Sequence, residues 1–68
     1  MSVYRVTDII GTSSKSWEDA AKEALATAAA SLRDLRVAEV VAQDITMTDS
    51  GAIESFRTKL RVSFKYEK

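Results

Sequence analysis

The feature that most constrains this chain is the segment 53–66, in which apolar and basic side chains alternate as in a β-strand with two different faces. The apolar side chains, which fall on one face, are Phe56, Leu60, Val62, Phe64 and Tyr66. The basic side chains, which fall on the other face, are Arg57, Lys59, Arg61 and Lys65. We therefore expect this strand to bury its apolar face and to turn its basic face away from the core.

The segment before it, residues 37–47, is a strand pattern that is apolar on both faces. One face carries Val37, Val41, Ile45 and Met47, and the other carries Ala38, Val40 and Ala42. A single helix can cover only one of these faces. A chain of 68 residues is also close to the size at which one core only narrowly offsets chain entropy. The sequence therefore predicts self-assembly, which would bury the second face.

Composition excludes several classes of function. The chain has no cysteine and no histidine, so it lacks a disulfide framework, a thiolate zinc site, a thiol nucleophile and an imidazole base. Hydrolase activity and thiol-based redox activity are therefore disfavoured. Ten basic and ten acidic residues cancel, which argues against nucleic-acid or membrane partners. The uncharged run 24–32 is too short to span a bilayer and no signal region precedes the first strand pattern, so we expect a cytoplasmic protein.

The order of elements along the chain predicts one α+β domain over residues 1–68. A strand at 3–10 ends at Gly11-Thr12-Ser13, and a helix runs from Trp17 to Leu32 or Leu35. Ser16 is the expected N-cap, with acidic side chains in the first turn where the helix dipole favours them. Trp17 begins the apolar stripe of this helix and is expected to be a core residue.

The hairpin that joins the last two strands fixes their predicted register. If Asp49-Ser50-Gly51 is a three-residue loop with Gly51 in the left-handed conformation, Thr48 pairs with Ala52 and the register runs on without interruption. Val40 then lies opposite Leu60, Glu39 opposite Arg61, and Gln43 opposite Arg57. We expect a β-α-β-β unit with a three-stranded antiparallel sheet in the order first, third, second, packed on one helix.

Several segments together resemble the dodecin family over essentially the whole chain. They are Val3-Tyr4-Arg5-Val6, Ile9-Ile10-Gly11-Thr12-Ser13, the alanine-rich helix, Val37-Ala38-Glu39-Val40, and Lys59-Leu60-Arg61-Val62-Ser63-Phe64. Dodecins are strand–helix–strand–strand proteins that form hollow dodecamers, and their best-known members sequester flavins. The resemblance implies a homododecamer that stores a small ligand or a metal ion and is not an enzyme.

Two positions depart from the flavin-binding members of this family. Those members typically have Trp where this chain has Val37, and Gln where it has Arg57. The predicted register puts both positions on the face away from the helix. Valine offers no flat surface for ring stacking, and arginine can only donate hydrogen bonds. The flavin-equivalent residues Val37 and Arg57 are therefore expected not to hold a flavin, although a flavin or another planar anion is the alternative ligand.

Within the family, the chain is most similar to the flavin-lacking calcium dodecins. The shared stretches are Asp8-Ile9-Ile10-Gly11-Thr12-Ser13, Ser16-Trp17-Glu18, Arg36-Val37-Ala38, Gln43-Asp44 and Val62-Ser63-Phe64-Lys65. This resemblance implies calcium as the ligand. Calcium prefers several hard oxygen ligands. The candidates are Asp44, Asp8 and Glu18, expected at one end of the unit, where the outer strands finish and the helix begins. The competing interpretation of Asp44 is a carboxylate that faces the helix N-terminus.

Two further clusters have a functional and a structural interpretation. Asp49 and Glu54 flank the hairpin, but their spacing does not fit an EF-hand, and an ordinary turn is favoured. The basic residues Arg57, Lys59, Arg61 and Lys65 would suit an anion site, whereas salt bridges with acids such as Glu39 are the simpler reading. RNA binding is disfavoured, because the aromatic side chains lie on the opposite face from the basic ones.

Overall fold

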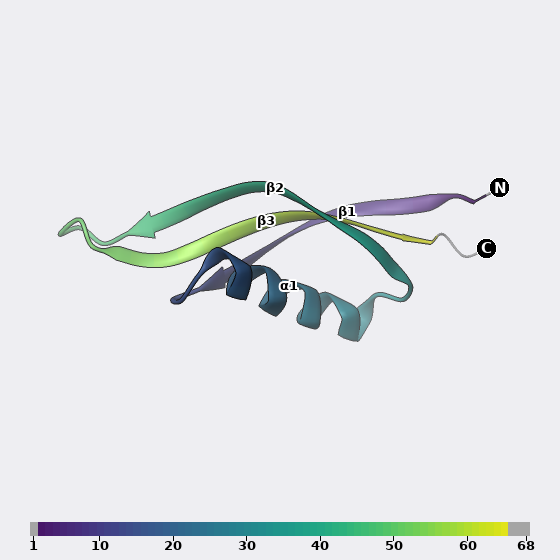
Figure 1. Cartoon of the computed structure of the whole chain (residues 1–68), viewed down its shortest axis with the longest axis horizontal. Coiled ribbons are helices and arrows are strands. Elements are labelled where there is room, and N and C mark those ends of the chain that lie inside the picture. Colours follow the sequence, from purple (N-terminus) through teal and green to yellow (C-terminus); the bar gives the residue numbers. More distant parts are fainter. Residues whose placement is uncertain (1, 66–68) are drawn as a thin grey trace.

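The structure, a computed structural model, describes residues 2–65. It consists of β1 (Tyr4–Ser13), α1 (Trp17–Ser31), β2 (Leu35–Met47) and β3 (Ile53–Lys65). The three strands form one antiparallel sheet in the order β1-β3-β2, and α1 lies against it (Figure 1). The predicted α+β class and strand order are confirmed. Tyr66, the predicted last residue of the third strand, lies outside the described residues.

Helix α1 begins as predicted. The Ser16 hydroxyl accepts a hydrogen bond from the Asp19 amide at 2.9 Å, so Ser16 is the N-cap. The helix ends earlier than its longest predicted extent. Leu32 has an extended backbone, and Asp34 has a φ of 57°, which turns the chain away from the helix axis. Leu35, which fits the spacing of the helical stripe, therefore begins β2 instead.

Strand β1 continues three residues beyond its predicted end at Ile10. Gly11 pairs with Thr58 and Ser13 pairs with Phe56, so Gly11 does not end the strand. Gly11 is buried, and a Cβ at this position would overlap the Ala20 carbonyl oxygen of α1. The glycine is required for close packing between strand and helix and not for a chain reversal.

The hairpin register is confirmed at both ends of the β2–β3 pair. Ala38, Glu39 and Val40 lie opposite Val62, Arg61 and Leu60, as predicted. At the turn, Gly51 has a φ of 90°, and the Thr48 amide donates to the Ala52 carbonyl oxygen at 2.8 Å. The predicted loop is therefore correct.

Between these ends the predicted register is wrong by one residue. A register shift at Val41 places Asp44 opposite Arg57 and Ile45 opposite Phe56, and a second shift after Thr46 restores the pairing of Met47 with Ile53. The shift turns Ile45 onto the helix side of the sheet, away from the face that carries Val37. Gln43 now lies opposite Thr58 and not opposite Arg57.

The aromatic residues of the helix side explain this shift. The rings of Trp17 and Phe56 meet edge to face with centroids 5.2 Å apart. In an uninterrupted register Asp44 would lie opposite Phe56, with its carboxylate beside these rings and without a cationic partner. The bulge gives Ile45 that position instead. The hydroxyls of Thr46 and Ser55, 2.6 Å apart, join the strands in the shifted segment.

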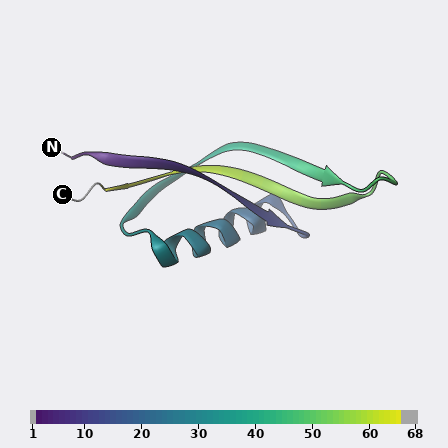
Figure 2. The same cartoon turned by 180° about the vertical axis from the view of Figure 1, so that it is seen from behind.

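The helix covers only part of the sheet. It packs against β1 and β3, whereas β2 and the end of the β2–β3 hairpin extend beyond it (Figures 1 and 2). The apolar side chains that are buried among the described residues are Ala20, Ala28, Leu60 and Val62. Large apolar side chains remain exposed on both faces, at Val3, Tyr4, Val6, Ile10, Val37, Val40, Val41, Ile45, Met47 and Ile53. The prediction that one helix leaves apolar surface on β2 uncovered is confirmed.

Candidate functional site on the open face of the sheet

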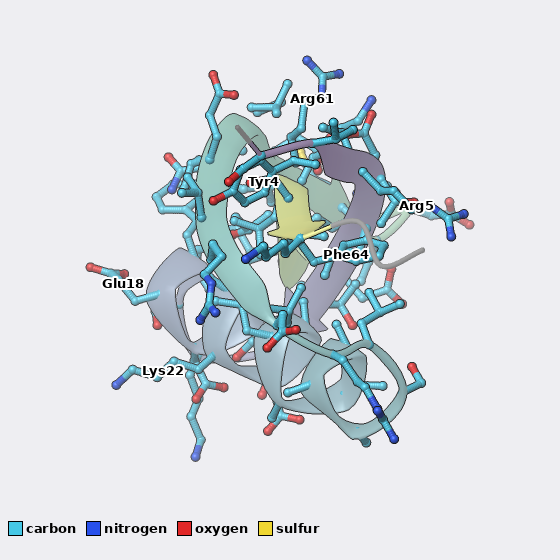
Figure 3. The ribbon with its side chains drawn as sticks, turned by 90° about the vertical axis from the view of Figure 1, so that its right-hand side faces the viewer. Tyr4, Arg5, Glu18, Lys22, Arg61 and Phe64 are labelled. Atoms are coloured by element: carbon cyan, nitrogen blue, oxygen red, sulfur yellow. The ribbon has the colours of Figure 1, made fainter. Side chains whose placement is uncertain are left out.

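The open face is the side of the sheet opposite α1. Thr58, Leu60 and Val62 of β3 are buried towards α1, so the residues that alternate with them point to the open face. They form a row of three cationic side chains along the central strand, namely Arg57, Lys59 and Arg61. Figure 3 shows Arg61 extending from the sheet on the side away from the helix. Strands β1 and β2 place acidic residues on either side of this row.

Arg61 forms a two-point ion pair with Asp8, its partner in β1. The Arg61 Nε donates to Asp8 Oδ1 at 2.9 Å, and Nη2 donates to Oδ2 at 3.1 Å. Lys59 Nζ is 4.0 Å from Asp8 Oδ2. These hydrogen bonds hold the pKa of the Asp8 carboxyl below its usual value, with help from the positive charges of Arg61 and Lys59. Glu39 lies opposite Arg61 in β2, so the guanidinium stands between two acids.

Arg57 forms a matching ion pair with Asp44 on the other side of the central strand. The Arg57 Nε donates to Asp44 Oδ1 at 2.7 Å, and Nη2 donates to Oδ2 at 2.9 Å. The hydrogen bonds lower the pKa of Asp44 and raise that of Arg57. The pair contributes to stability above the ordinary pKa of an aspartate, and this contribution is lost as the pH falls through the lowered pKa. Both side chains are solvent-exposed, so the contribution is small.

The Asp44 carboxylate therefore does not face the helix N-terminus, and that interpretation is wrong. The backbone of Asp44 meets the helix start instead, because the Trp17 indole N–H donates to the Asp44 carbonyl oxygen at 3.0 Å. Sequence reasoning missed the Arg57–Asp44 pair because it assumed an uninterrupted register. The available signal was Phe56, which requires an apolar neighbour across the hairpin and finds it in Ile45.

The three candidate calcium ligands do not converge within one chain. Asp8 and Asp44 share the open face, but the paired residues Ile10, Lys59 and Ala42 lie between them. Glu18 projects from the exposed surface of α1, on the other side of the sheet (Figure 3). Among residues 2–65, no group of three or more acidic, histidine or cysteine side chains is arranged to hold a metal ion. Because calcium takes about six to eight oxygen ligands, these residues of a single chain do not fit a calcium site.

The two flavin-equivalent positions also lie apart in one chain. Val37 is exposed on the open face and pairs with Ser63, whereas Arg57 lies six residues before Ser63 in β3. At about 3.3 Å per residue, this places them roughly 20 Å apart. One planar ring can meet both positions only if they come from different subunits.

The basic residues of β3 and the acidic residues of the hairpin each had a functional and a structural interpretation. The structure favours the structural one in both cases. Arg57 and Arg61 each direct two N–H groups to a carboxylate of the same chain, which favours salt bridging over an anion site on this row. Asp49 lies in the hairpin turn, whose Thr48 and Ser50 hydroxyls are 3.0 Å apart.

The single helix of residues 2–65 lacks the length and the apolar character that a membrane span requires.

Comparison with known proteins agrees with this architecture. The dodecin family profile matches residues 3–67. The chain is 55% identical over 65 residues to the calcium dodecin of Mycobacterium tuberculosis, which covers 96% of this chain and 90% of that protein. The crystal structure of a calcium dodecin from the same organism, described as calcium chelating, superposes with a TM-score of 0.86 at 53% identity over 97% of this chain and 93% of the other. A dodecin structure from Streptomyces coelicolor gives a TM-score of 0.91 at 30% identity over 98% and 94% of the two chains. The chain belongs to the dodecin family.

Proposed function

We propose that this chain is the subunit of a hollow homododecamer that binds and stores a ligand in the cytoplasm and catalyses no reaction. The observation that carries the assembly is the imbalance between a very small core and a large exposed apolar surface. Among the described residues, the buried apolar side chains are two alanines, one leucine and one valine. Such a core does not offset the entropy of ordering a chain of this length. Burial of Val6, Ile10 and Val37 of the open face between subunits supplies what one chain lacks.

We propose calcium as the ligand. A relative with 55% identity is a calcium dodecin, and the open face presents two exposed aspartates that are ionised at neutral pH. Because residues 2–65 of one chain lack a complete set of ligands, the proposed site combines carboxylates of Asp8, Asp44 or Glu18 from neighbouring subunits. Carboxylates from several chains would supply both the number and the charge of oxygen atoms that calcium requires.

Thermal unfolding in calcium and in chelator tests this ligand. A hundredfold excess of calcium over the dissociation constant should raise the melting temperature by on the order of 10 °C, because the ion binds only the folded assembly. The increment should disappear in Asp44→Asn and persist in Asp49→Asn, which alters only the hairpin turn. Trp17 is the only tryptophan, and its indole N–H donates a hydrogen bond to the Asp44 carbonyl oxygen. Calcium binding at Asp44 should therefore also change the tryptophan fluorescence. Identical melting curves in calcium and in chelator, with no metal found by elemental analysis, would rule out calcium as the ligand.

Flavin is the alternative ligand, and Val37 and Arg57 make it testable. We expect riboflavin or FMN to keep its fluorescence when titrated into the assembly, because quenching needs close stacking on an aromatic ring. The double change Val37→Trp with Arg57→Gln should recover part of the quenching, whereas Arg57→Gln alone should not. Strong quenching by the unmodified protein at submicromolar flavin would place flavin ahead of calcium.

A further inference from the structure

Among residues 2–65, the end of the β2–β3 hairpin carries an apolar face that the rest of the chain leaves exposed. We call residues 45–55 the arm. Ile45 lies opposite Phe56 on the helix side of the sheet. Met47 and Ile53 pair with one another and continue this face beyond the start of α1 (Figure 1). Ile45, Met47 and Ile53 are 38%, 60% and 56% exposed. A two-stranded ribbon is only marginally stable in water, so the arm needs a surface to pack on.

A second exposed apolar surface lies on the same side of the sheet, at the other end of β2. Because α1 packs against β1 and β3, a groove of about 270 Å³ remains between the helix and β2. We call this groove the shelf. Its apolar lining includes Leu25, Ala29, Leu35, Ala38 and Val62. The shelf is therefore a surface on which apolar side chains of the arm can be buried.

The arm cannot reach the shelf of its own chain. The Trp17 indole binds the Asp44 carbonyl oxygen, so the start of α1 lies close to the arm. Ala29 lies twelve residues further along the helix, roughly 18 Å from this point. Met47 lies three residues beyond Asp44 in the opposite direction, roughly 10 Å from it (Figure 1). An arm that packs on a shelf must therefore belong to another molecule.

Charge complementarity indicates that this molecule is a second copy of the chain. The charged residues of the arm are Asp49 and Glu54, which are both acidic. The charged residue in the described lining of the shelf is Arg36, whose side chain is 53% exposed and lies 3.7 Å from Asp34. The arm and the shelf thus match in charge as well as in their apolar side chains.

The groove on the other side of α1, between the helix and β1, is a poorer match for the arm. It is larger, at about 710 Å³, but polar side chains form much of its lining: Thr7, Thr12, Glu23, Thr27 and Ser31. The aliphatic side chains of the arm would remove water from these hydroxyls and from the carboxylate without replacing their hydrogen bonds.

We propose that the arm of one subunit packs on the shelf of a neighbouring subunit, with its acidic residues towards Arg36. This inference rests on the proposed function, because it takes the protein as an assembly of identical chains. The arm and the shelf are different patches, so the contact can run head to tail and close a ring. A closed assembly of twelve chains needs more than one self-complementary contact, because such a contact alone gives only a dimer. The arm and the shelf supply a contact besides the one on the open face.

Disulfide cross-linking tests this contact without background, because the natural chain has no cysteine. In the double variant Met47→Cys with Ala29→Cys, mild oxidation should join the arm of one chain to the shelf of another. Within one chain the two positions are much further apart than the roughly 7 Å between Cα atoms that a disulfide can bridge. On a non-reducing denaturing gel, we expect most chains to shift from the monomer band to bands of two or more chains.

Other cysteine variants serve as controls. Met47→Cys alone and Ala29→Cys alone should remain in the monomer band, because neither position is then beside a second thiol. Met47→Cys with Thr27→Cys places the second thiol in the groove on the β1 side of α1, and it should also remain in the monomer band. Ile53→Cys with Ala29→Cys should cross-link, because Ile53 lies opposite Met47. This pair replaces the first if the first does not fold.

The outcomes separate this inference from the proposed function, provided that each protein is sized by sedimentation velocity before oxidation. Three results would overturn the arm–shelf contact while the assembly stands: no cross-linking in either arm–shelf pair, equal cross-linking in the single variants, or cross-linking through Thr27→Cys at least as strong as through Ala29→Cys. A wild-type chain that sediments as a folded monomer would overturn both the contact and the proposed assembly.

Discussion

Gly11→Ala is expected to abolish stable folding or to lower the free energy of unfolding more than Gly51→Ala does. The new Cβ would overlap the Ala20 carbonyl oxygen and lie 2.8 Å from the Ala24 Cβ, so α1 would have to move away from β1. Overpacking of this kind costs about 1–3 kcal/mol and often more where backbone must move. The small core leaves little reserve to absorb that loss. Urea denaturation followed by circular dichroism measures the effect.

Gly51→Ala is the matched control, because it separates crowding from backbone strain. Gly51 has a φ of 90°, but a Cβ there would meet no atom within 4 Å. Its replacement should cost roughly 1 kcal/mol through strain alone. If Gly11→Ala is no more destabilising than Gly51→Ala, the close contact between β1 and α1 is not what requires glycine at position 11.

Val37→Asp is expected to break the assembly. Val37 is 62% exposed in the isolated chain, so a carboxylate there should cost little within one subunit. Buried between subunits, an unpaired carboxylate costs several kcal/mol at every copy. Sedimentation velocity should therefore show small or unfolded species for Val37→Asp and the wild-type species for Ala26→Asp, which adds the same charge to an exposed helix position. An unchanged sedimentation coefficient for Val37→Asp would mean that this face is not an interface.

The parts of the fold that local signals determine could be predicted from the sequence. Ser16 was identifiable as an N-cap by its residue type and the acids that follow it, and Gly51 by the turn that needs a left-handed residue. Alternation in the last strand indicated which side chains face the helix, and the three-residue hairpin loop gave the pairs from Ala38 to Val40.

The bulge at Val41 could not be predicted in the same way. Residues 37–47 are apolar on both faces, so their alternation is compatible with either register after Val40. The choice depends on Trp17, which lies 27 residues before Asp44 and closes the aromatic cluster that Ile45 joins. A contact over that distance in the chain is not visible in a local pattern. The role of Gly11 was missed for the same reason, because it depends on where α1 packs.

The candidate site was predictable as a face but not as a set of contacts. The basic row of β3 follows from its alternation, and Val37 was placed correctly on the same face. The partners of Asp8 and Asp44 depend on the β1 register and on the bulge, and both aspartates prove to be held by arginines. The predicted meeting of Asp8, Asp44 and Glu18 assumed that residues near the ends of neighbouring elements approach one another. Glu18 instead extends from α1 (Figure 3), whereas the two aspartates pair with arginines on the face of the sheet opposite α1.

A native mass spectrum of the wild-type protein, recorded from calcium-containing buffer and again after chelation, tests the central claim most directly. We expect one species with the mass of twelve chains, which carries additional mass equal to a whole number of calcium ions. Chelation should remove the added mass and leave the twelve chains together, because the proposed interfaces bury exposed apolar side chains and each aspartate has an arginine partner within its own chain. A folded monomer at micromolar concentration would contradict the assembly, and a dodecamer without added metal mass would contradict calcium as its ligand.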